Sequence, residues 1–140
     1  MIVPMASMTS LQHVAVQETR RGRRSGRGFT LVRIAPVGWA MQEPELTVLE
    51  RFAEAQLRRT DFVQRSLPHR EVGLVLVETL EPAARVPIER LRAALGAQFP
   101  ALQLGIGWCS VGPGYRRGWE EAWRWAGTML VADAAVPAAA

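Results

Sequence analysis

Helical and strand patterns alternate along this chain, and that alternation restricts the folds open to it. The apolar run from Val72 to Val77 (V-G-L-V-L-V) predicts a central strand. The run from Phe29 to Ala35 (F-T-L-V-R-I-A) predicts another strand, which Pro36 ends. Apolar residues at helical spacing from Pro44 to Arg59 predict a helix with glutamates near its start and arginines at its end, as the helix dipole favours.

The remaining patterns complete a regular order of elements. Further helices are predicted over residues 10–24, 82–95 and 119–133, and further strands over residues 61–65 and 102–111. The strand over 61–65 and the central strand are placed to form a hairpin around Ser66–Arg70. The resulting order, α-β-α-β-β-α-β-α, predicts an α/β fold in which helices pack on a mixed sheet, as in ferredoxin-like sandwiches.

Composition sets limits on the kinds of function. The 140 residues suit one domain, expected over residues 10–135 with flexible ends at 1–9 and 136–140. Apolar runs reach only about six residues, too short for a membrane span, and the chain start lacks a signal-peptide layout, so a cytoplasmic protein is expected. Cys109 alone cannot form an internal disulfide, and Cys109 with His13 and His69 is too few ligands for zinc, so no metal or cofactor is expected.

The basic residues are all arginine, seventeen in number, and the net charge is +4. Each guanidinium is a planar fork suited to phosphate or carboxylate. This charge is compatible with an anionic ligand and does not demand nucleic acid.

Several stretches, in their order and spacing, resemble the GGDEF domains of the diguanylate cyclase family. The similarity runs over residues 10–133. It implies a degenerate GGDEF-like domain, expected over residues 10–135, with a nucleotidyl-cyclase-like fold. The stretches that carry it are R-R-S-G-R-G-F-T-L-V-R-I, L-R-R-T-D-F-V-Q-R, E-V-G-L-V-L-V-E-T, I-E-R-L-R-A-A-L and L-Q-L-G-I-G-W.

The resemblance also implies that catalysis has been lost. Active members bind metal through aspartates at the end of the first strand, and alignment on Trp39 places Ala35 and Val37 at those positions. Neither side chain can ligate a hard cation. At the signature turn, the family's G-G-D/E-E-F is replaced by Pro68, His69, Arg70, Glu71 and Val72. Arg70 stands where the metal-binding acid is expected and would repel a cation. We therefore expect a protein that is not an enzyme.

A second site of the family is implied to persist. Many members bind cyclic di-GMP at an inhibitory R-x-x-D site ahead of the turn, helped by an arginine on the next helix. Arg58, Asp61 and Arg90 match these positions, allowing one extra residue in the turn. Guanidinium forks suit phosphodiester oxygens or a guanine edge, and a carboxylate can accept from guanine N–H groups. A competing interpretation is structural: Arg58 ends a helix while Asp61 caps a turn or pairs with an arginine.

Two further features leave alternatives open. Arginines at 20, 21, 23, 24 and 27 could contact nucleic acid or an acidic partner, but a solvated helix end and loop is favoured, so nucleic acid is not the expected partner. The five tryptophans could stack on a purine but are more typical of a core or a protein interface. The alternative function is therefore a ligand-free scaffold that binds an unidentified protein or a second copy of itself through the final helix.

Overall fold

The computed structural model describes residues 8–66, 70–115 and 117–135. Within these residues, four helices and four strands follow one another in the predicted order, with one short 3-10 helix before the last strand. Their bounds are α1 Met8–Ser25, β1 Phe29–Pro36, α2 Glu43–Ala55, β2 Phe62–Ser66, β3 Glu71–Val77, α3 Arg85–Gln98, η1 Pro100–Leu102, β4 Leu104–Val111 and α4 Gly118–Ala135. Both expected flexible ends lie largely outside the described residues.

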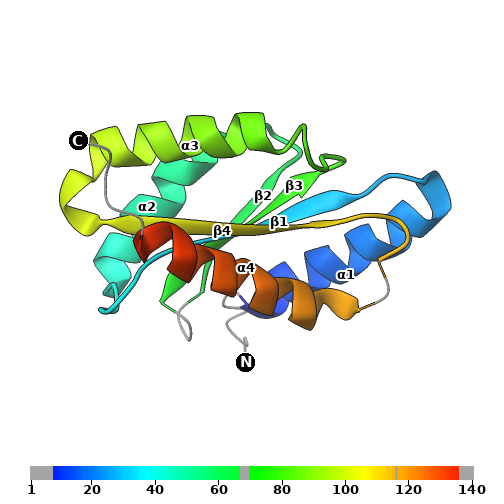
Figure 1. Ribbon diagram of the computed structural model, residues 1–140, viewed down its shortest axis with the longest axis horizontal. Helices are drawn as coiled ribbons and strands as arrows, with labels where there is room; N and C mark the ends of the chain where they lie inside the picture. The colour runs from blue at the N-terminus through cyan, green and yellow to red at the C-terminus, as the bar shows by residue number, and fades with distance from the viewer. Residues whose placement is uncertain (1–7, 67–69, 116, 136–140) are drawn as a thin grey trace, which may run out of the picture.

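The strands form one sheet in the order β2-β3-β1-β4 (Figure 1). The α/β sandwich is confirmed, but the expected mixed sheet is corrected, because all described neighbours pair antiparallel. The reason is topological. The crossover through α2 joins β1 to β2 and the crossover through α3 joins β3 to β4, and each crossover leaves one intervening strand of opposite direction. Parallel strands therefore never become neighbours.

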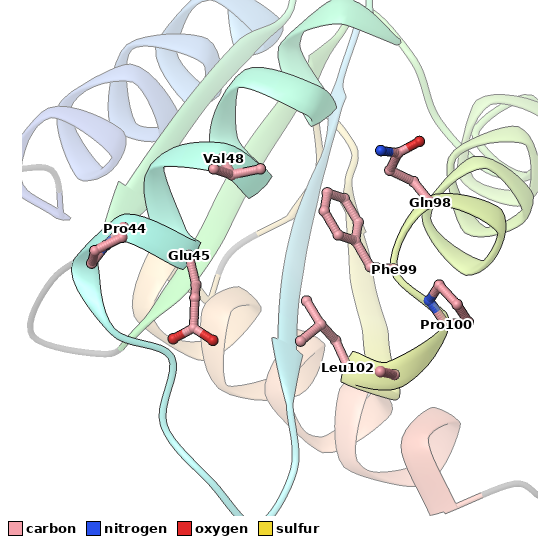
Figure 2. A pocket seen from close by; sticks show the side chains of 8 residues that line it. Pro44, Glu45, Val48, Gln98, Phe99, Pro100 and Leu102 are labelled. Carbon is pink, nitrogen blue, oxygen red and sulfur yellow. The ribbon is translucent and has the colours of Figure 1, made fainter.

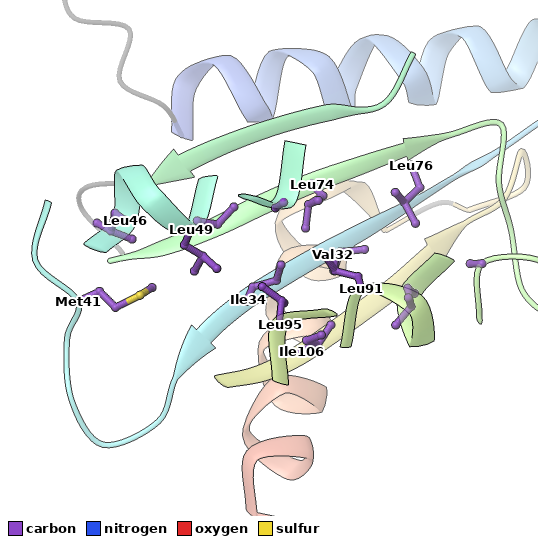
Figure 3. Packing of buried hydrophobic residues seen from close by; sticks show 14 residues of the cluster. Val32, Ile34, Met41, Leu46, Leu49, Leu74, Leu76, Leu91, Leu95 and Ile106 are labelled. Atoms are coloured by element: carbon purple, nitrogen blue, oxygen red, sulfur yellow. The ribbon is translucent and has the colours of Figure 1, made fainter. Parts of the chain in front are cut away.

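Helices cover both faces of the sheet. Figure 1 shows α2 and α3 on one face and α1 and α4 on the other. The first face buries side chains from β1, β3 and β4 beneath α2 and α3, including Val32, Leu74 and Ile106 (Figure 3). The second face buries Phe29, Leu31 and Val75 beneath α1 and α4. The central strands β1 and β3 are thus buried on both sides, which explains their nearly unbroken apolar sequence.

Helix α2 starts where its local signals place it. Gln42 and Glu45 form a reciprocal capping box, and Pro44 occupies the first turn, where a missing N–H costs nothing. Leu46, Leu49 and Ala53 are fully buried at helical spacing. No helix in the described part of the chain is both long and apolar enough to cross a membrane.

Several predicted boundaries were wrong by a few residues. Helix α2 ends at Ala55 rather than Arg59, because residues 56–61 fold into a turn. Helix α3 starts at Arg85 rather than Pro82 and continues through Gly96 to Gln98. Strand β4 starts at Leu104, after the 3-10 helix and Gln103, which is left-handed with φ 51°.

Each edge strand has a carboxylate on a main-chain N–H. The N–H of Arg65 in β2 donates to Glu50 Oε2 of α2 over 2.6 Å, and the Arg65 guanidinium pairs with the same carboxylate. On β4, the N–H of Ile106 donates to Asp133 Oδ2 of α4 over 2.9 Å, while Asp133 also pairs with Arg92 of α3. Helices from both layers are therefore tied to the sheet edges.

Candidate functional site

The R-x-x-D pair forms a closed turn between α2 and β2. The Arg58 fork meets the Asp61 carboxylate through two bonds, Nη2 to Oδ1 over 2.8 Å and Nε to Oδ2 over 3.1 Å. The main-chain N–H of Arg58 also donates to Oδ2, and the N–H of Val77 donates to Oδ1. Asp61 therefore has four N–H donors, and only 3% of its side chain is exposed.

The Arg58 guanidinium is fixed further by the end of β3. Its Nη2 donates to the Val77 carbonyl and to the Thr79 hydroxyl, each over 2.9 Å. The hydrogen bond with Asp61 is the main cause of a raised pKa for Arg58. Burial, the second-largest effect, lowers this pKa, and the nearby negative charges of Asp61 and Glu78 each add a smaller increase. Even so, 59% of the side chain is exposed, so one face of the fork stays open to solvent.

The third predicted residue, Arg90, lies exposed on α3. Its guanidinium makes no hydrogen bond or ion pair within the described part of the chain. The structure therefore brings Arg58 and Asp61 into direct contact, and it records no interaction that joins Arg90 to them. The structural interpretation of R-x-x-D, a carboxylate that closes a turn and pairs with an arginine, is confirmed as geometry. Ligand binding at these residues stays a prediction.

The signature turn is described in part. Pro68 and His69 lie outside the described residues. Arg70 is exposed with φ 52°, and Glu71 and Val72 start β3 as buried residues. Glu71 forms a bidentate ion pair with Arg33 of β1, with Nε to Oε1 at 2.7 Å and Nη2 to Oε2 at 3.0 Å. Glu71, which the resemblance aligns with an acid of the family's turn, is thus bound to an arginine of this same chain.

Arg33 also ties this pair to α4. Its Nη1 donates to the Trp123 carbonyl over 2.8 Å, and its guanidinium lies 4.3 Å from the centre of the Trp123 ring. Gly127 leaves room for the guanidinium, because a Cβ there would lie 2.2 Å from Arg33 Nη1. Gly107 lets α4 approach β4, because a Cβ there would lie only 1.7 Å from a carbonyl of α4. Arg33, Glu71 and Trp123 are hereafter called the Arg33 clasp.

Sequence reasoning missed the Arg33 clasp. A usable signal was present, because Arg33 is the lone charge in the apolar run F-T-L-V-R-I-A. A charge in a buried strand needs a partner, since an unpaired buried charge is expensive. That signal predicts a buried acid but cannot name Glu71, which lies 38 residues further along the chain.

The positions aligned with the family's metal-binding aspartates lie at the end of β1. Ala35 is buried, and Val37, just beyond the strand, is 45% exposed. Both carry hydrocarbon side chains, which offer no ligand to a hard cation. Within residues 8–66, 70–115 and 117–135, no three His, Cys, Asp or Glu side chains gather in a way that could hold a metal ion.

The arginines at and just after the end of α1 and the tryptophans differ in their contacts and in their burial. All five arginines are exposed; Arg21 and Arg27 both bind Glu78, each over 2.9 Å. A core role is confirmed for Trp123, which is 7% exposed. Trp108 and Trp119 are partly buried, and Trp39 and Trp125 are 42% and 55% exposed.

An apolar groove of about 440 Å³ lies between the start of α2 and the end of α3 (Figure 2). Residues of α2, the last residue of α3 and the segment after it line the groove, namely Pro44, Glu45, Val48, Gln98, Phe99, Pro100, Ala101 and Leu102. Glu45 already serves the capping box through its bond from the Gln42 N–H. None of the three predicted ligand-binding residues borders this groove.

The chain is similar to known proteins in its structure, although not in its sequence. No protein-family model matches the sequence, and no curated protein matches it either. The structure is similar to the diguanylate cyclase SiaD from Pseudomonas aeruginosa, solved in complex with its activator SiaC, with a TM-score of 0.71. The identity is 18% over 89% of this chain and 53% of that chain. A diguanylate cyclase protein from Thermotoga maritima gives a TM-score of 0.68 at 12% identity, over 87% of this chain and 92% of that one.

PelD from P. aeruginosa PA14 (residues 156–455), in complex with cyclic di-GMP, is also similar. It gives a TM-score of 0.57 at 17% identity, over 90% of this chain and 50% of that one. The chain thus spans about half the length of the SiaD and PelD chains. The predicted resemblance is confirmed at the level of structure: the chain has the fold of GGDEF diguanylate cyclase domains.

Proposed function

We propose that this chain is a non-catalytic GGDEF-like signalling domain that binds cyclic di-GMP through Arg58 and Arg90, with Asp61 holding Arg58 in place. The shared fold supports a role in cyclic di-GMP signalling, and PelD is a protein of similar fold that was solved in complex with cyclic di-GMP. Ala35 and Val37 at the aligned metal positions support the loss of catalysis, because GTP cyclisation depends on metal ions.

The geometry of Arg58 carries the proposal. Asp61, Val77 and Thr79 engage the Nε and Nη2 atoms, so the orientation of the guanidinium is set before any ligand arrives. Its Nη1 atom makes no hydrogen bond within the described residues, and the side chain is largely exposed. A fork that is already ordered loses less conformational entropy on binding, and its free donors suit a phosphodiester.

Asp61 acts indirectly in this proposal. Four N–H groups already occupy its oxygens, so contact with a guanine base requires that it release Arg58 or the main chain. We therefore assign Asp61 the role of a positioning residue. Arg90, whose exposed guanidinium has no partner within the described part of the chain, supplies a further contact from α3 to the phosphate that Arg58 binds.

Isothermal titration with cyclic di-GMP tests the binding. We expect micromolar affinity for the wild-type protein, which corresponds to about 8 kcal/mol. Arg58→Ala should abolish the heat, and Arg58→Lys should weaken it strongly because a point charge cannot replace a fork. Arg51→Ala is the matched control, since Arg51 is an exposed arginine on α2 that is outside the proposed site. No heat with the wild type would refute binding.

Incubation with GTP and Mg²⁺ tests the absence of catalysis. We expect no cyclic di-GMP by chromatography at protein concentrations at which an active diguanylate cyclase converts all the substrate. Product that forms at a rate proportional to protein concentration, and that survives further purification, would show that the non-catalytic assignment is wrong.

A scaffold function is the second candidate, and the outer face of α4 favours it. Trp125 is 55% exposed and Met129, one turn further along, is 36% exposed. Contiguous exposed apolar side chains mark interaction surfaces, and these two lie on the same face of α4. Sedimentation equilibrium of the wild type and of Trp125→Ser tests this candidate. Self-association that Trp125→Ser weakens would support a homodimer formed through α4.

A further inference from the structure

Glu78, just after β3, connects the R-x-x-D turn to the arginine-rich end of α1. Its Oε1 accepts from Arg21 Nη2 and its Oε2 accepts from Arg27 Nη1, each over 2.9 Å. Arg21 is in the last turns of α1, and Arg27 is in the loop before β1. One carboxylate therefore holds two guanidinium groups that come from different segments.

The residues on either side of Glu78 hold Arg58. The Val77 carbonyl and the Thr79 hydroxyl accept from Arg58 Nη2, and the Glu78 charge is close enough to help raise the pKa of Arg58. Arg21, Arg27 and Arg58 thus converge on three consecutive residues. We call Glu78 and these three arginines the Glu78 cluster.

The Glu78 cluster is accessible and under backbone strain. The side chains of Arg21 and Arg27 are 53% and 64% exposed, and that of Glu78 is 32% exposed. Arg21 also lies 3.6 Å from Glu18, while Arg27 has only Glu78 as an acidic partner among the described residues. Glu78 has φ 53°, a left-handed conformation that is unfavourable for a non-glycine residue.

A carboxylate between two guanidinium groups has the same chemistry as a phosphate held by two arginines. We propose that Glu78 is a built-in competitor: its carboxylate occupies the position that the second phosphate of the ligand takes between Arg21 and Arg27, beside Arg58. This inference rests on the proposed function, because it requires a ligand with two phosphodiesters. When the ligand binds, Arg58 contacts its first phosphate. Arg27 and Arg21 then release Glu78 and contact the second phosphate.

Removing the competitor should strengthen binding. Titration of Glu78→Gln with cyclic di-GMP should show an affinity at least about threefold higher, the size expected for removing one charge a few ångströms from an exposed anion. Arg27→Ala should weaken binding about tenfold, as expected for the loss of a charge-assisted contact. In the double variant Glu78→Gln/Arg27→Ala, the gain from Glu78→Gln should shrink, because the arginine that it frees is missing.

Matched controls separate this mechanism from general electrostatics. Glu81→Gln makes the same charge change at an exposed glutamate paired with Arg85, and Arg24→Ala makes the same change as Arg27→Ala at an exposed arginine of α1. Both controls should leave affinity within about twofold of the wild type, as expected for screened surface charges. Equal unfolding midpoints in urea for all variants would show that they are folded.

The outcomes distinguish this inference from the proposed function. If Arg58→Ala abolishes binding but Glu78→Gln leaves it unchanged or weaker, the competitor role is refuted while the binding site stands. If Glu81→Gln strengthens binding as much as Glu78→Gln, the effect is general charge and the inference also fails. No binding in the wild type refutes the proposed function and, with it, this inference, whatever the titration of Glu78→Gln shows.

Discussion

Replacement of Glu71 by glutamine should lower the free energy of unfolding by about 3 kcal/mol, near the low end of the range for breaking a buried ion pair. The Glu71 side chain is 6% exposed and that of Arg33 is 15% exposed, so the variant leaves Arg33 charged and poorly hydrated. Arg33 keeps its bond to the Trp123 carbonyl and its contact with the indole ring, which limits the loss. In addition, the glutamine amide places N–H groups, which cannot accept a hydrogen bond, beside the N–H groups of the Arg33 guanidinium.

Urea unfolding followed by tryptophan fluorescence measures this loss. The midpoint should fall while the m value stays constant, since the same surface is exposed on unfolding. Glu81→Gln is the control, because its ion pair with Arg85 has the same chemistry but is exposed, and its loss should cost under about 0.5 kcal/mol. The double variant Arg33→Met/Glu71→Leu should recover most of the stability, since it leaves no charge buried.

Two results would refute this reasoning. A cost for Glu71→Gln no larger than that for Glu81→Gln would mean that burial does not decide the strength of the pair. A double variant as unstable as Glu71→Gln alone would mean that the unpaired charge of Arg33 is not the cause of the loss. Either result would remove the Arg33 clasp as an account of how α4 is attached to the signature turn.

The remaining predictions concern packing, pH and the R-x-x-D turn. Gly107→Ala should destabilise the protein by more than about 3 kcal/mol or prevent folding, because the added Cβ would overpack against the main chain of α4. Gly96→Ala, on the open surface of α3, should stabilise the protein by about 0.5–1 kcal/mol. Urea titration measures both changes, and equal effects would contradict the close approach of α4 to β4. Burial raises the pKa of the Cys109 thiol above its ordinary value of 9.0, so the unfolding free energy should be level below about pH 9, fall as pH rises through the raised pKa, and fall less in Cys109→Ala. Asp61→Asn should cost about 1–2 kcal/mol in urea, because it weakens the bonds to Arg58, and a neutral effect would mean that the turn does not depend on them.

The central strands were predictable because their signal is local. Phe29–Ala35 and Val72–Val77 are apolar, β-prone and bounded by a proline or a turn, and burial on both faces rewards that pattern wherever it occurs. The end of α2 was not predictable in the same way. Arginines after Ala55 suit a helix C-terminus, but the Asp61 carboxylate accepts the Arg58 N–H and closes a turn instead.

In the candidate site, too, local contacts could be predicted from the sequence and long-range contacts could not. The contact between Arg58 and Asp61 joins residues three apart, so the alternatives for this pair were visible in the sequence. The contacts of Glu78 with Arg21 and Arg27 join residues 57 and 51 apart, and they depend on how α1 lies beside the end of β3. No local pattern specifies such a pairing, because it arises only when the sheet and helices have packed.

The carboxylates at the two sheet edges restrict how this domain can meet other molecules. A peptide that extended the sheet would need the outward N–H groups of β2 or β4. Those of Arg65 and Ile106 are occupied by Glu50 and Asp133, so a visiting strand would have to displace a carboxylate that also neutralises an arginine. Strand addition is therefore disfavoured at both edges, which leaves the helical faces and the loops as the surfaces open to other molecules.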